Sequence, residues 1–95
     1  MPAYVVAQIE VTDPEKYEDY RKLAPAVIEK FGGRFLVRGG EMDTLEGEQP
    51  FPRMVVLEFP SLDTIRQFYA SPEYQHAKAA RDGAARMVFT ALEGL

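Results

Sequence analysis

The chain has 95 residues and no cysteine, and its 15 acidic and 11 basic side chains give a net charge of −4 at pH 7. The length is that of one domain, and 46% hydrophobic with 27% charged residues is an ordinary globular composition. The lack of cysteine excludes disulfides, thiolate catalysis and iron–sulfur sites, and the lack of a basic stripe argues against nucleic-acid binding.

A strand and a helix are predicted first along the chain. Residues 3–11 are rich in β-branched side chains and alternate between a fully apolar face and a mixed face, which is typical of a strand. Asp13 and Pro14 then form a helix start, as a cap and a first-turn proline. Apolar side chains follow at helical spacing until residues 32–33, two glycines that stop the helix. Pro25, inside this run, predicts a kink or a break.

Two strands joined by an acidic loop come next. Residues 34–39 (RFLVRG) and 53–59 (RMVVLEF) have strand character. Residues 40–52 between them are acidic and rich in turn residues, and the prolines at their end stop regular pairing. Their acidic side chains do not have the spacing of a calcium-binding EF-hand, so we read them as a solvated loop.

A broken helix and a last strand complete the pattern. Ser61 is the predicted cap of a helix with apolar side chains at helical spacing. Ser71 and Pro72 repeat the start signal, so the helix should restart there in a new direction. Residues 82–83 close this second part, and residues 86–92 (RMVFTAL) have strand character.

The order β-α-β-β-α-β predicts an α+β fold of the ferredoxin-like type over residues 1–95. Right-handed crossovers place both helical segments on one face of a four-stranded antiparallel sheet. The side chains expected to face the helices are Val5, Ala7, Ile9, Phe35, Val37, Val55, Leu57, Phe59, Met87, Phe89 and Ala91.

The opposite face of this sheet is predicted to be largely apolar as well. It should carry Tyr4, Val6, Leu36, Met54, Val56, Val88 and Leu92, beside the polar Gln8, Arg38, Glu58 and Thr90. An exposed apolar patch of this extent indicates a partner surface. We therefore expect a homodimer in which two sheets pack face to face about a two-fold axis.

Five segments of the chain, in order along nearly its whole length, resemble domain-of-unknown-function family 1330: VTDPEKYEDYRK, PAVIEKFGGRFLVRGGE, LEG, VVLEFPS and FYASPEYQHAKAAR. That family is similar to the dimeric α+β barrel superfamily. The superfamily includes cofactor-independent monooxygenases, muconolactone isomerases, haem-dependent peroxidases and ligand-binding regulatory domains. The resemblance therefore implies the fold and the dimer, but no particular reaction, because one fold hosts many chemistries. The positions that match the family's motif are Tyr17, Tyr20, Gly32, Gly33, Arg38, Gly39, Gly40, Gly47, Glu58, Tyr69, Ser71, Tyr74 and Arg81.

Three polar residues are candidates for chemistry on the sheet and the last helix. His76 is the only histidine, and a histidine side chain can act as a general acid–base, although a lone histidine on a surface helix more often has no such role. Arg38 and Glu58 should lie on neighbouring strands and on one face. Such a pair could orient a substrate acid or form a structural ion pair.

The helical layer contributes tyrosines that could line a ligand pocket beside the helix break at residues 71–72. Tyr17, Tyr20, Tyr69 and Tyr74 offer apolar rings with polar tips, which suit an aromatic or enolic ligand, with a core position favoured for Tyr17. Arg81, two helical turns after Tyr74, could balance the charge of a bound anion. The alternative is that these side chains only pack the helices onto the sheet.

Two classes of function therefore stay open: a cofactor-free oxygenase or isomerase of a small aromatic or enolisable molecule, and a non-catalytic small-molecule binder. We expect no metal, flavin or haem, because one histidine cannot build a multi-histidine site and no glycine pair fits a phosphate-binding loop. Residues 1–4 lack the basic region and apolar stretch of a signal peptide, and no apolar run approaches the length of a membrane helix. We therefore expect a cytoplasmic protein that contacts no membrane.

Overall fold

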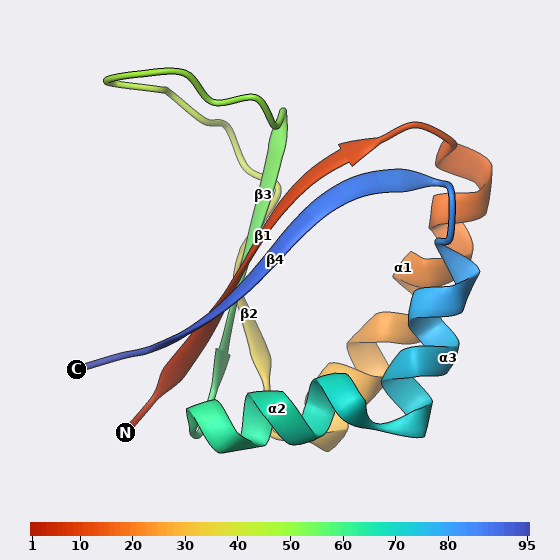
Figure 1. Ribbon diagram of the computed structural model, residues 1–95, viewed down its shortest axis with the longest axis vertical. Helices are drawn as coiled ribbons and strands as arrows, with labels where there is room; N and C mark the ends of the chain where they lie inside the picture. Colours follow the sequence, from red (N-terminus) through yellow and green to blue (C-terminus); the bar gives the residue numbers. More distant parts are fainter.

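The computed structural model describes residues 1–95 and has two layers, a four-stranded sheet and three helices that all lie on one of its faces (Figure 1). The strands run antiparallel in the order β2-β3-β1-β4. This arrangement confirms the ferredoxin-like prediction. The elements are β1 (Ala3–Val11), α1 (Pro14–Lys30), β2 (Arg34–Arg38), β3 (Arg53–Phe59), α2 (Leu62–Ala70), α3 (Pro72–Ala80) and β4 (Ala85–Glu93). None of the helices has the length and apolar composition of a membrane-spanning segment.

The helix starts follow the capping signals in the sequence. The side chains of Asp13 and Ser61 each accept a hydrogen bond from a backbone N–H three residues ahead, at 3.2 and 3.0 Å. Ser71 ends α2 and starts α3: its hydroxyl donates to the carbonyl of Phe68 at 2.7 Å and accepts from the N–H of Tyr74 at 3.1 Å. This double role fixes the change of helix direction that lets the helices follow the twisted sheet.

Helix α1 continues without interruption through Pro25, so the break predicted there does not occur. Proline has no N–H to donate to the carbonyl four residues back, that of Arg21. Arg21 is exposed, so water can bond that carbonyl. Buried residues before and after the proline, Tyr20 and Ile28 among them, pack against the rest of the molecule and hold the two halves in one helix.

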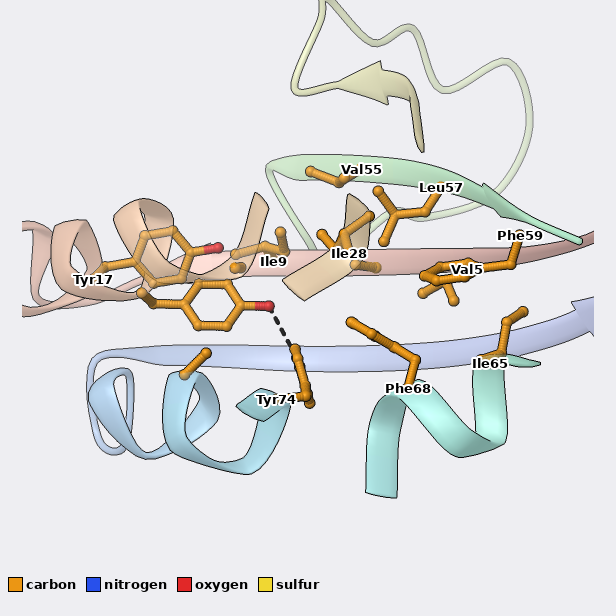
Figure 2. Packing of buried hydrophobic residues seen from close by; sticks show 14 of the residues in the cluster. Val5, Ile9, Tyr17, Ile28, Val55, Leu57, Phe59, Ile65, Phe68 and Tyr74 are labelled. Carbon is orange, nitrogen blue, oxygen red and sulfur yellow. Dashed lines mark hydrogen bonds between the residues drawn. The ribbon is translucent and has the colours of Figure 1, made fainter. Parts of the chain in front are cut away.

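The core fills the space between the sheet and the helices, where apolar side chains of both layers meet (Figure 2). Phe68 lies at its centre. The centroid of its ring is 4.5 Å from that of Tyr74 and 5.0 Å from that of Phe59, within the range of favourable aromatic contacts. All three side chains are at most 1% exposed, so this aromatic cluster anchors α2 and α3 to β3.

Replacing Gly33 with alanine should destabilise the fold, because the added methyl group has no room. An ideal Cβ there would lie 2.6 Å from a ring carbon of Phe59 and 2.8 Å from Cγ2 of Ile28. Overpacking of this kind costs about 1–3 kcal/mol, which urea denaturation would measure. Gly40→Ala is the matched control, since nothing lies within 4 Å of its Cβ position; equal losses in both variants would contradict the steric argument.

A β-bulge in β2 changes which side chains face the helices. Phe35 lies opposite Leu57 on the helix side, but the register then shifts, so that Val37 lies opposite Val56 and Arg38 opposite Val55. One extra residue in a strand reverses the alternation beyond it. The predictions that Val37 faces the helices and that Arg38 lies on the other face are therefore wrong. Arg38 lies on the helix side of the sheet and Val37 on the opposite side.

No helix covers the second face of the sheet (Figure 1). Apolar side chains there are substantially solvent-exposed, with Val37 and Val88 at 44% and Leu36 and Leu92 at 45%. Soluble monomers rarely expose a contiguous apolar surface of this kind. We call this surface the open face.

Candidate functional site

A pocket of about 50 Å³ lies between α1 and the sheet. The backbone of α1 lies closer to that of α3 than to the strands. The floor of the pocket is apolar and comes from all four strands, while Tyr17 and Tyr20 of α1 form part of its wall. Three arginines also line it, Arg21 of α1, Arg38 of β2 and Arg53 of β3.

The guanidinium groups of Arg38 and Arg53 have no carboxylate partner. Arg21 forms an ion pair with Glu18 at 3.4 Å, but neither of the other two arginines belongs to any ion pair. The Cζ of Arg38 lies 4.3 Å above the ring of Phe35, a cation–π contact that orients it. The Nε of Arg53 is buried without a hydrogen-bond partner.

Beside the pocket, two tyrosines and an arginine form a hydrogen-bonded chain. Nη2 of Arg81 donates to the hydroxyl of Tyr74 at 3.3 Å, and this hydroxyl lies 2.9 Å from that of Tyr20. Tyr74 is 0% exposed, and its hydroxyl has no other partner to which it could donate, so its proton is best satisfied by the oxygen of Tyr20. The proton of the Tyr20 hydroxyl is then free for another acceptor.

Burial keeps the two pocket tyrosines protonated. It raises the pKa of Tyr20 well above its ordinary value, and the neighbouring Tyr74 raises it further. Burial also raises the pKa of Tyr17, against the opposing charges of Arg53 and Arg81. The hydroxyl of Tyr17 makes no hydrogen bond within the protein. At neutral pH both hydroxyls are therefore donors and not bases.

The raised pKa of Tyr20 predicts a loss of stability in alkali. A phenol whose pKa is higher in the folded than in the unfolded state binds its proton more tightly when folded. Its contribution is fully present below about pH 10, the ordinary pKa of tyrosine, and decreases as the pH rises above it. Urea denaturation should show this decrease, and Tyr20→Phe should show a shallower one; identical slopes in the two proteins would contradict the prediction.

The structure brings together four of the seven predicted site residues. Tyr20, Tyr74 and Arg81 form the hydrogen-bonded chain. Arg38 and Tyr20 both line the pocket beneath α1. Tyr69 packs on Tyr74 with ring centroids 5.4 Å apart, but it lines a neighbouring apolar cavity between α2 and the edge of the sheet.

His76 and Glu58 lie away from the pocket. His76 is exposed on α3 and does not line it. Glu58 pairs with Arg34 across β2 and β3, with Nε and Oε1 2.8 Å apart, on the face away from the helices. The predicted pairing of Glu58 with Arg38 is therefore wrong, because the bulge turns Arg38 to the opposite face.

Two arginines of the pocket, Arg21 and Arg53, are not among the residues predicted from the sequence. The alternation that places Val55 and Leu57 toward the helices also places Arg53 there, since it lies opposite the buried Ile9. That alternation was the available signal, but an arginine at the start of a strand reads as a solvated residue. Tyr17 belongs to the helical apolar stripe, where a core role was the expected one. No three His, Asp or Glu side chains gather closely enough to hold a metal ion.

The fold and the pocket beneath α1 define a protein of the ferredoxin-like class, and known structures share this architecture. One is a protein of unknown function from Rhodopseudomonas palustris. The superposition covers 99% of this chain and 82% of the Rhodopseudomonas chain, with a TM-score of 0.79 and 21% sequence identity. For a dimeric ferredoxin-like protein of unknown function from Jannaschia sp. CCS1, the superposition covers 99% of this chain and 100% of the other, with a TM-score of 0.67 and 13% sequence identity. For the cofactor-independent oxygenase SnoaB from Streptomyces nogalater, the superposition covers 99% of this chain and 93% of the other, with a TM-score of 0.65 and 16% sequence identity.

The chain belongs to the family described as Domain of unknown function (DUF1330), whose model matches residues 2–95. This confirms the family resemblance in the sequence. Comparison with curated proteins finds no match. At these identities the likeness to solved structures establishes the fold alone, so the function has to be argued from the pocket.

Proposed function

We propose that the protein is a cofactor-independent enzyme, an oxygenase or isomerase, that binds a small aromatic or enolisable molecule in the pocket beneath α1. The observation that carries this proposal is the free hydroxyl of Tyr17 in a pocket with mostly apolar walls and two unpaired guanidinium groups. The same fold serves a cofactor-independent oxygenase in SnoaB, which supports the class of reaction.

The pocket suits the ionised form of such a molecule. Its apolar walls would pack against a ring, which needs more room than the pocket's volume of about 50 Å³, so the exposed side chains of Arg21 and Arg38 would move aside on binding. The hydroxyls of Tyr17 and Tyr20 would donate hydrogen bonds to an enolate or phenolate oxygen. The positive charges of Arg38 and Arg53 favour the anion, so they lower the pKa of the bound enol or phenol. An enolate can react directly with O₂, as in an oxygenase, or take up a proton at another carbon, as in an isomerase.

Oxygen consumption and absorbance changes test this proposal. The protein would be screened against polyphenols and enol-lactones, with Tyr17→Phe as the variant and Tyr4→Phe, on the open face, as the matched control. Loss of one oxyanion donor typically lowers kcat by about 10²–10³-fold. Turnover that is equally fast in Tyr17→Phe would contradict the role of this hydroxyl.

One observation favours a second candidate, a non-catalytic binder. Both pocket tyrosines have raised pKa values, and arginine does not act as a base at neutral pH, so the pocket offers no general base. A substrate that loses its proton under the influence of the arginines needs no general base. A molecule that keeps its proton would bind without reacting. Binding of the screened compounds by calorimetry without oxygen uptake or absorbance change would select the binder.

We further propose that the protein is a homodimer joined through the open face, as the description of the Jannaschia protein as dimeric supports. Two copies of an apolar, self-complementary sheet face would cover each other around a two-fold axis. The absence of cysteine fits a reducing compartment, and we propose that the dimer works in the cytoplasm without a metal, flavin or haem.

A further inference from the structure

The mouth of the pocket holds positive charge that the rest of the protein does not neutralise. The chain as a whole is acidic, with a net charge of −4, and four of its cationic side chains are paired with carboxylates. Those four are Arg21, Lys30, Arg34 and Arg86. Arg38 and Arg53 have no such partner, although acidic residues outnumber basic ones and an acidic loop follows β2 directly.

Backbone geometry places these two arginines on the same face of neighbouring strands, and both line the pocket. The bulge in β2 puts Arg38 opposite Val55, two residues along β3 from Arg53 and on the same face. Gly39 follows Arg38 with φ +71°, and a Cβ on it would lie 2.8 Å from Cζ and 2.9 Å from Nε of Arg53. The guanidinium of Arg53 therefore lies against Gly39, the residue that follows Arg38 in the chain.

Both arginines lack acceptors. The ring of Phe35 supports Arg38 from below, and the Nε of Arg53 is buried without a partner. A buried donor with no partner costs free energy, and that cost is removed when a ligand supplies an acceptor. A planar guanidinium group matches the geometry of a carboxylate, which accepts paired N–H donors.

We propose that the ligand of this pocket is a small aromatic or enolisable carboxylic acid whose carboxylate binds between Arg38 and Arg53. The inference rests on the proposed function, because it places the rest of the ligand beneath α1. The ring or enol then lies on the apolar floor, with its oxygen toward Tyr17 and Tyr20. The two guanidinium groups carry one positive charge more than the carboxylate neutralises, so they still favour ionisation of the enol or phenol, whose oxygen the tyrosines contact.

Calorimetric titration of the full chain with two matched probes tests this inference. The probes are 4-hydroxybenzoate and 4-hydroxybenzamide, which differ mainly in the charge of one group. The carboxylate should bind at least about tenfold more tightly, a difference of about 1.4 kcal/mol. Arg38→Gln and Arg53→Gln should each abolish this preference and leave the affinity for the amide unchanged.

Two further variants separate the role of the guanidinium from that of charge alone. Arg38→Lys should retain only part of the preference, because a lysine cannot bind a carboxylate in a bidentate manner. Arg66→Gln removes an exposed, unpaired arginine of α2 that does not line the pocket, and it should bind both probes as the unaltered protein does. Circular dichroism would confirm that each variant is folded.

The outcomes distinguish this inference from the proposed function. Equal affinity for the acid and the amide would overturn the carboxylate site and leave an aromatic-binding pocket intact. Tight, arginine-dependent binding of 4-hydroxybenzoate by a protein that turns over neither this acid nor any compound of the oxygen and absorbance screen would support the site and overturn the enzyme. Binding of neither probe would overturn both.

Discussion

Replacing Val56 with aspartate should convert the proposed dimer into a monomer or unfold the protein. Val56 is at the middle of the open face, opposite Val6 on β1 and Val37 on β2. In a two-fold dimer each copy contributes one such aspartate to an apolar interface, where an unpaired charge is costly. We expect the dimer dissociation constant to rise about 100-fold or more, equivalent to about 2.8 kcal/mol.

Light scattering at micromolar concentration measures this effect. The unaltered protein should have about twice the 10.7 kDa mass of the chain. Leu23→Asp is the matched control, since it introduces the same charge at a side chain of α1 that is 36% exposed; it should stay dimeric. A monomeric unaltered protein, or a Val56→Asp variant that remains a fully stable dimer, would refute the proposed interface.

Replacing Phe68 with alanine should produce the largest loss of stability from a single change in the core. Its ring, 1% exposed, contacts Phe59 and Tyr74 and lies 6.0 Å from the ring of Phe31. Removal of a buried phenylalanine leaves a cavity and typically costs about 3–5 kcal/mol. Small domains have a total stability of only about 5–15 kcal/mol, so the variant should be near its unfolding threshold.

Thermal or urea denaturation followed by circular dichroism gives the comparison. Leu45→Ala also shortens a large apolar side chain, but Leu45 is 91% exposed in the acidic loop. That control should change the free energy of unfolding by no more than about 0.5 kcal/mol. If Phe68→Ala were as stable as the control, the aromatic cluster would not be what joins the helices to the sheet.

The sequence by itself determined the elements, their order and the fold they form. Capping side chains at Asp13, Ser61 and Ser71 act over three residues, and strand alternation has a period of two, so both signals are local and can be read directly. The apolar character of both sheet faces also follows from the alternation of residues within each strand. The order of the elements then restricts the topology, because crossovers have a fixed hand.

The tertiary structure alone decided which polar groups meet in the pocket. The glycine pair at residues 39–40 is typical of a bulge or a turn, but it does not specify the bulge between Phe35 and Val37 that turns Arg38 toward the helices, because a bulge depends on the register between β2 and β3. The separation of Arg38 from Glu58 follows from the same shift. Contacts on both sides of Pro25 likewise keep α1 continuous where local chemistry predicts a break. Each of these features depends on residues distant in the chain, so local patterns could not specify them.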